Sequence, residues 1–249
     1  MYCDELQVVI PHKAHSAGTL ISIGANTIIM TKQATLGPID PSINTPLNPI
    51  VQDGPLMRSI PVSVEAIKGY LAFAKEELNI KEDKALADIM VKLSDKVHPL
   101  VLGQVYRARA QIKMLAEKLL TNQISDGKKI KKIIDFLCSD SGSHDYTINR
   151  REAKDSLGLN IIKPDKELYE IINRVYTDFS QELKIGSPLD LRDLAKHTNG
   201  AYSIKRCLLE SIEGGSDYFV TEGKVVIQNV GPGNAQLREE RIYEGWKHE

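Results

Sequence analysis

Apolar and polar positions follow two different periods in the N-terminal part of the chain. Residues 8–10 form a short apolar, β-branched run of the kind that makes a buried parallel strand, and Pro11 ends it. A helix of small residues is predicted over residues 16–26, and a second β-branched run covers residues 27–31. This strand–turn–helix–strand unit places the first residue of the helix beyond the carboxyl end of a strand, where open α/β sheets bind ligands.

The rest of the chain is dominated by helical periods. Residues 41–61 are rich in Pro and Asn and predict a long loop, either a substrate lid or oligomer contact or a solvated connection. Ser63 is a predicted helix cap, and the apolar residues after it are spaced for one helical face. Further helices are predicted at residues 85–93, 99–121, 128–138 and 165–184, followed by a β-hairpin from strands at residues 201–212 and 217–230. We therefore expect a core over residues 1–164, with a loop and helical insertion at 41–140, and a C-terminal α+β extension over residues 165–249.

Ser16 is the residue at the start of the first predicted helix. Serine is a common N-cap residue, so a purely structural cap is one interpretation. The other is an acyl-transfer nucleophile, because the backbone N–H of Ala17 is available beside the hydroxyl and Gly18 carries no side chain to block a substrate. The rigid turn that ends at Asp40 follows the second strand on the same edge of the sheet, where functional residues concentrate.

The segment AHSAGTLISIGANTIIM, followed by LGPIDPS, resembles the serine dehydrogenase proteinase family. This family is part of the Clp/crotonase-like group, together with the Clp protease proteolytic subunit and the signal peptide peptidases. The resemblance implies an α/β Clp/crotonase-like fold, a peptide or protein substrate and a homo-oligomer. It also implies that Ser16 is the nucleophile and that Ala17 supplies an oxyanion N–H.

The partners of Ser16 are less well defined by the sequence. His144 and Asp145 resemble the family's His-Asp-Tyr segment, and Asp145 stands where the Clp subunit has its triad aspartate. A Ser–His–Asp group is chemically reasonable, although adjacent residues on a strand point to opposite faces. The Clp subunit takes its histidine from the strand after the nucleophile helix, where this chain has none. Asp40 is a second possible partner, and Lys68 matches the lysine base of the signal peptide peptidases only in coming several tens of residues after the serine.

Two alternatives compete with a peptidase. The resemblance implies an upstream βαβ portion with a glycine pair that completes the oxyanion hole, and the chain begins after it. A truncated or catalytically inactive protein with an assembly or regulatory role is therefore the main alternative. A thioester-binding protein is a third, since crotonase-like proteins also handle thioesters.

Composition excludes several other classes of protein. The chain has 32 basic and 33 acidic residues, and this balance argues against an electrostatic nucleic-acid binder. Cys3, Cys138 and Cys207 are widely separated and predict free thiols in a reducing compartment. The sequence shows neither a membrane span nor a signal peptide, so the expected location is the cytoplasm. We expect no cofactor, because metal-ligand spacing and a phosphate-binding glycine loop are both absent.

Overall fold

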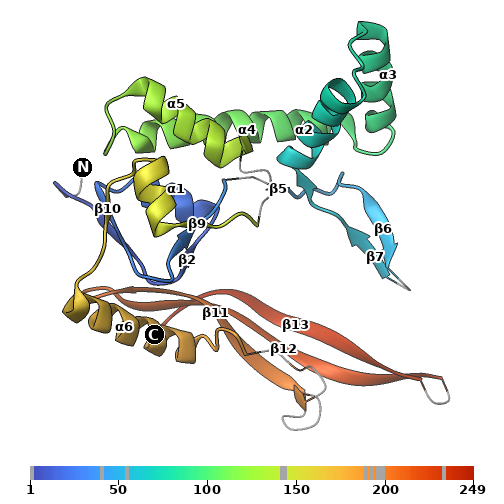
Figure 1. Ribbon diagram of the computed structural model, residues 1–249. Helices are drawn as coiled ribbons and strands as arrows, with labels where there is room; N and C mark the ends of the chain where they lie inside the picture. Colours follow the sequence, from blue (N-terminus) through green and yellow to red (C-terminus); the bar gives the residue numbers. More distant parts are fainter. Residues whose placement is uncertain are drawn as a thin grey trace. The chain divides into compact units, whose positions relative to one another are not determined.

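The computed structural model describes residues 3–39, 42–53, 56–140, 145–187, 190, 193–194, 200–231 and 234–249. The chain is a mixed α/β protein that divides into two compact units, Met1–Tyr169 and Glu170–Glu249 (Figure 1). This division falls inside α6 (Lys166–Glu182), whereas the predicted boundary precedes that helix.

A parallel three-stranded sheet begins the first unit. It contains β1 (Gln7–Ile10), the central strand β3 (Thr27–Met30) and β10 (Ile161–Ile162). All four residues of β3 are buried, as its β-branched sequence predicts. β1 was also predicted to be buried, but this is wrong for Val9, which is 44% exposed. Burial alternates along β1, with Gln7 and Val9 exposed and Ile10 buried, so one face of this strand lies at the surface.

A second three-stranded sheet holds the Ser16 turn. β2 (Lys13–Ala14) pairs in parallel with β4 (Thr35–Leu36), and β4 pairs antiparallel with β9 (Ile148–Asn149). Between β2 and β3 lies α1 (Ala17–Ile23), which ends earlier than the predicted helix at residues 16–26.

Side-chain amides explain why α1 ends early. Asn122 Nδ2 donates to the Gly24 carbonyl at 2.7 Å, and Gln123 Nε2 donates to the Ile23 and Ala25 carbonyls at 2.9 and 3.1 Å. Both amides come from the turn that follows α4 (Pro99–Leu120). These bonds satisfy carbonyls at the helix end without another helical turn.

The segment predicted as a long loop contains three short strands, and a fourth follows directly after it. β5 (Ser42–Ile43) pairs with β8 (Val62–Ser63), and β6 (Ile50–Asp53) pairs with β7 (Leu56–Ser59). The described part of residues 41–61 is therefore not a loop throughout, because parts of it pair as strands. β6 reads IVQD and β7 reads LMRS, so neither strand alternates apolar and polar residues, and β5 and β8 have only two residues each.

The predicted helices of the insertion are present. Ser63 caps the first of them, since its Oγ accepts the Ala66 N–H at 3.1 Å. In Figure 1, α5 lies along α4, and the two helices are in contact. Besides α4, the helices of this region are α2 (Val64–Ala72), α3 (Asp83–Ser94) and α5 (Gly127–Asp135), with π-helical turns at Phe73–Glu77, Phe136–Asp140 and, before β10, Glu152–Ser156.

Two separate apolar clusters stabilise the first unit. The larger joins the parallel sheet and α1 to the C-terminal end of α4 and to α5, through residues such as Ile23, Ile28, Leu120 and Ile133. The smaller joins β8 and α2 to the N-terminal end of α4 and consists of Val62, Val64, Val97, Val101 and Val105.

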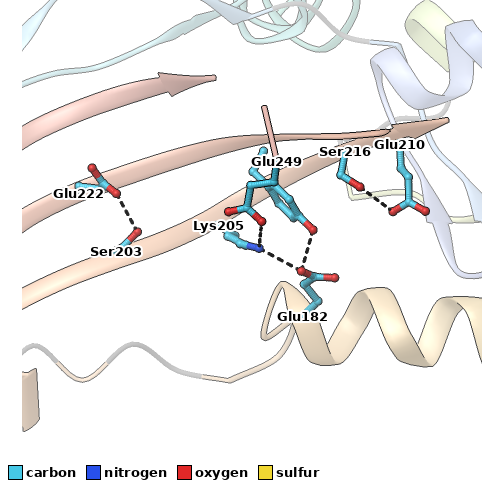
Figure 2. A network of polar contacts seen from close by, with 8 residues as sticks. Glu182, Ser203, Lys205, Glu210, Ser216, Glu222 and Glu249 are labelled. Atoms are coloured by element: carbon cyan, nitrogen blue, oxygen red, sulfur yellow. Dashed lines mark hydrogen bonds and ion pairs between the residues drawn. The ribbon is translucent and has the colours of Figure 1, made fainter. Parts of the chain in front are cut away.

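The second unit is an antiparallel sheet with the C-terminal part of α6. Its strands are β11 (Ala201–Ser211), β12 (Gly215–Gly231) and β13 (Asn234–His248), and β13 is additional to the predicted hairpin. Glu182, at the end of α6, accepts hydrogen bonds from Lys205 at 3.0 Å and from Tyr218 at 2.7 Å. Figure 2 shows the bond between Lys205 and Glu182. Lys205 also pairs with Glu249. Neither unit contains, in its described part, a helix with the length and apolar character that crossing a membrane requires.

Candidate functional site

Ser16 connects β2 to α1 with a rare backbone conformation. Its φ of 52° and ψ of −112° lie in a region that glycine adopts readily and other residues seldom adopt. Such conformations cost about 1–3 kcal/mol each and persist where the surrounding structure enforces them, often at functional sites. A serine on a strained strand-to-helix turn, with its hydroxyl directed away from the helix, is the geometry of the nucleophile in several hydrolases.

The Ser16 hydroxyl does not cap α1. Ser16 occupies the N-cap position, yet its side chain makes no capping hydrogen bond. Ser63 offers a direct comparison: it has φ −74° and ψ 135°, and its hydroxyl does cap α2. Of the two interpretations from sequence, the structural cap is therefore wrong for Ser16.

The backbone around Ser16 is closed by local hydrogen bonds. The Gly18 N–H donates to the His15 carbonyl at 2.9 Å, and the Leu20 N–H donates to the Ser16 carbonyl at 3.1 Å. The Gly18 N–H is thus engaged within the turn. No bond from the Ala17 N–H is found in the described part of the chain. Unlike the Gly18 N–H, the Ala17 N–H is therefore a backbone donor that is still available beside the Ser16 hydroxyl.

Thr19 was not predicted from the sequence. This residue is fully buried, and its Oγ1 lies 2.8 Å from both the Ala14 and Gly37 carbonyls and accepts the Gly37 N–H at 3.1 Å. The available signal was spacing: Thr19 precedes the buried Ile23 by one helical turn, which places its hydroxyl on the inner face of α1.

His15, next to Ser16, is held by β4. Its Nε2 lies 3.0 Å from Thr35 Oγ1. Gly37 packs directly beneath the imidazole, because a Cβ added there would lie 2.7 Å from His15 Cγ. The turn that carries Ser16 and the end of β4 therefore fit together without space for a further side chain.

The pairing of three short strands brings separate segments to one edge. Ala14 pairs with Leu36, and Leu36 pairs with Ile148. Because β2 and β4 are parallel while β9 is antiparallel to β4, the residues after Ala14, after Leu36 and before Ile148 all leave the sheet at the same edge. Neighbouring strands are about 4.8 Å apart. Ser16 and the segment that begins at Asp145 therefore lie on either side of the Gly37 turn.

The segment before β9 is exposed and locally ordered. Asp145 is exposed and lies in a turn rather than in a strand, so the strict alternation of side chains does not apply to it. Tyr146 OH donates to Glu152 Oε1 at 2.6 Å, and this bond raises the pKa of the Tyr146 hydroxyl. Asn149 Oδ1 accepts the Glu152 N–H at 3.1 Å and so caps the helical turn that follows. His144 and Asp40 are outside the described residues.

Lys68 is placed away from this edge. It lies on α2, is 39% exposed and is 3.8 Å from Glu65. α2 belongs to the cluster at Val101, whereas Leu119, near the other end of α4, contacts α1 at Gly24. At about 1.5 Å per residue, Val101 and Leu119 are about 27 Å apart along the helix. The structure therefore does not bring Lys68 to Ser16.

Among the described residues, neither the cysteines nor the metal-binding residue types form a second candidate site. All three cysteines are free thiols, as their spacing predicted. Burial raises the pKa of the Cys138 thiol to about 11, so it is a core residue rather than a nucleophile. Across the described ranges, no group of three or more His, Cys, Asp or Glu residues is arranged to hold a metal ion.

Comparisons with known proteins agree with the resemblance. An uncharacterized protein of Methanocaldococcus jannaschii is 29% identical over 157 residues, which are 63% of this chain and 43% of the relative. A second uncharacterized protein of this organism is 27% identical over 169 residues, 66% of this chain and 45% of the relative. The chain thus spans less than half the length of each of these relatives. No solved structure matches significantly.

The remaining comparison concerns the segment that contains Ser16 and the strands on both sides of it. The resemblance predicted from this segment is confirmed, because residues 2–54 match the sequence model of the family described as ClpP-like SDH-type serine proteinase.

Proposed function

We propose that this chain acts as a serine peptidase that cleaves peptide bonds through an acyl-enzyme on Ser16. One observation carries the proposal: Ser16 has a strained positive φ and a hydroxyl that does not cap the helix it precedes. The match of residues 2–54 to a serine proteinase family supports the same reaction class.

In the proposed reaction, Ser16 Oγ attacks the carbonyl carbon of the scissile peptide bond while a base takes the hydroxyl proton. The N–H of Ala17, the residue after the nucleophile, stabilises the oxyanion of the tetrahedral intermediate. Collapse of the tetrahedral intermediate breaks the C–N bond, and the amine leaves with the proton. Water then attacks the ester, and release of the acid regenerates Ser16.

We place the base in the segment of His144 and Asp145. The support is topological, since the residues before β9 leave the sheet at the same edge as the Ser16 turn. Imidazole is the usual base for a serine hydroxyl, and a carboxylate fixes its tautomer. Asp40, which follows β4 in the sequence, is a second group proposed to orient the base.

Two further parts of the proposal concern the fold and the assembly. The parallel sheet, with α1 between β2 and β3, supports a Clp/crotonase-like core. A homo-oligomer is expected from the resemblance, and large apolar side chains that are exposed on the insertion, such as Val91 (60%) and Leu100 (63%), are available for it. Light scattering at micromolar concentration measures the assembly directly.

Labelling with a fluorophosphonate tests Ser16. The full chain is expected to react, and Ser16→Ala is expected to remove the label. Ser63→Ala is the matched control, because Ser63 also stands at a helix N-cap but uses its hydroxyl as a cap. Equal labelling of the parent and Ser16→Ala would contradict the proposal, and so would an unlabelled parent, which favours the inactive alternative. Mass spectrometry of a peptide pool then separates peptide-bond cleavage from hydrolysis of other acyl groups.

A further inference from the structure

The strained turn at Ser16 needs a structural element that holds it. A residue with positive φ relaxes unless its neighbours enforce the conformation. The turn runs from Ala14, the last residue of β2, to the first turn of α1. A group that joins both ends of this turn to a third element would enforce the conformation of Ser16.

Thr19 makes all of these connections with one hydroxyl. Its Oγ1 reaches the Ala14 carbonyl before the turn and the Gly37 carbonyl after β4, both at 2.8 Å. The hydroxyl has one proton, so it donates to one of these carbonyls at a time. It also accepts the Gly37 N–H at 3.1 Å. Thr19 is fully buried, so water does not replace these bonds.

We propose that Thr19 is a positioning residue, whose buried hydroxyl ties Ala14, α1 and Gly37 together and so holds Ser16 in its strained conformation. The inference rests on the proposed function of Ser16 for its effect on reactivity, and on geometry alone for its effect on the turn. Thr19 does not contact substrate; it acts through the backbone of Ser16.

The chain offers a matched control for the test. Thr31 is 1% exposed, and its Oγ1 donates to the Pro11 carbonyl at 2.7 Å. Thr31→Val therefore removes a buried hydroxyl of the same kind outside the Ser16 turn. Thr19→Ser keeps the hydroxyl at Thr19 and is the rescue variant.

The first measurement is the rate of fluorophosphonate labelling at saturating and subsaturating probe. Thr19→Val is expected to lower the maximal rate about 10- to 100-fold, because small displacements of a nucleophile have effects of this size. The probe concentration for half-maximal rate is expected to stay unchanged. Thr19→Ser and Thr31→Val are expected to label at the parental rate. Equal rates for Thr19→Val and Thr31→Val would overturn the inference.

The second measurement does not depend on activity. Ser16→Gly relieves the strain and is expected to raise the Tm of the parent and of Thr31→Val by about 2–4 °C. In Thr19→Val the turn is already relaxed, so the same substitution is expected to give no rise. An equal rise in all three backgrounds would overturn the inference. A parent that is not labelled would instead overturn the proposed function, while the Tm comparison still decides the role of Thr19.

Discussion

One backbone angle at Ser16 connects the stability of the chain to its proposed chemistry. The positive φ belongs to a serine whose hydroxyl does not cap α1, at the edge where β2 and β4 end and β9 begins, and it costs folding free energy. Gly18, whose N–H bonds to the His15 carbonyl, closes the turn and leaves Ser16 as the strained residue within it. A site of this kind trades stability for reactivity.

This trade predicts different stabilities for two substitutions that both remove the hydroxyl. Ser16→Ala keeps a Cβ in the mirror-β region, whereas Ser16→Gly does not, so we expect Ser16→Gly to be more stable by about 1 kcal/mol or more. Urea unfolding of both variants measures the difference. An alanine variant that is at least as stable as the glycine variant would show that the turn at Ser16 is not strained in solution.

At the scale of single residues, the sequence predicted the identity of the central residue but not its conformation. Ser16 was found from the order of strand, small-residue helix and strand, because this pattern is local. The choice between a capping and a non-capping hydroxyl depends on φ at Ser16, which the residue type does not determine. Thr19 was missed because its three partners, at Ala14 and Gly37, are brought together by the pairing of β2 with β4.

At the scale of elements, an amide cluster ties α1, the end of α4 and β10. Gln123 donates from Nε2 to the Ile23 and Ala25 carbonyls and accepts the Asn160 N–H at 2.9 Å through Oε1. The side chain of Gln123 therefore connects the turn after α4 to the C-terminal end of α1 and to Asn160, the residue before β10.

We expect Gln123→Ala to lower the free energy of unfolding by about 2 kcal/mol, because two partly buried carbonyls, of Ile23 and Ala25, lose their partner, while the exposed Asn160 N–H can bond to water. Gln111→Ala is the control, since Gln111 is an exposed residue of α4. Chemical denaturation measures both variants. A loss for Gln123→Ala no greater than that for Gln111→Ala would contradict the role of the cluster.

Helices were predicted better than short strands. The apolar spacing in α2, α4, α5 and α6 repeats over several turns, so each helix is visible in the sequence. The two-residue strands β2, β4 and β9 are too short to show a period. Their pairing, which creates the site edge, joins residues that are far apart in the sequence, such as Leu36 and Ile148. The convergence of segments at Ser16 therefore required the structure.

At the scale of the whole chain, ion pairs make each unit sensitive to acid. Asp135 in the first unit has its pKa lowered by a hydrogen bond from Lys113 at 2.8 Å. In the second unit, the pKa of Glu182 is lowered mainly by its bond from Tyr218 and also by Lys205. Lys247 lowers the pKa of Glu222 in the same way.

The sign of the pH dependence follows from these shifts. A carboxyl with a lowered pKa in the folded state stabilises the chain above its unfolded pKa, here 3.8 for Asp135 and 4.5 for the two glutamates. This stabilisation is lost as the pH falls through the folded-state pKa. We therefore expect the free energy of unfolding to decrease as the pH is lowered from about 5 to about 3.

A triple variant tests this expectation across both units. Asp135→Asn with Glu182→Gln and Glu222→Gln is expected to lose less stability than the parent over this pH range, in urea titrations at each pH. The matched control removes three exposed carboxylates that have no ion pair among the described residues: Asp88→Asn, Glu117→Gln and Glu170→Gln. High salt is expected to reduce the difference in acid sensitivity between the parent and the triple variant, because these ion pairs are near the surface and are screened. Equal acid sensitivity of the triple variant and the control would show that the three pairs do not couple folding to pH, since the two variants change the net charge equally.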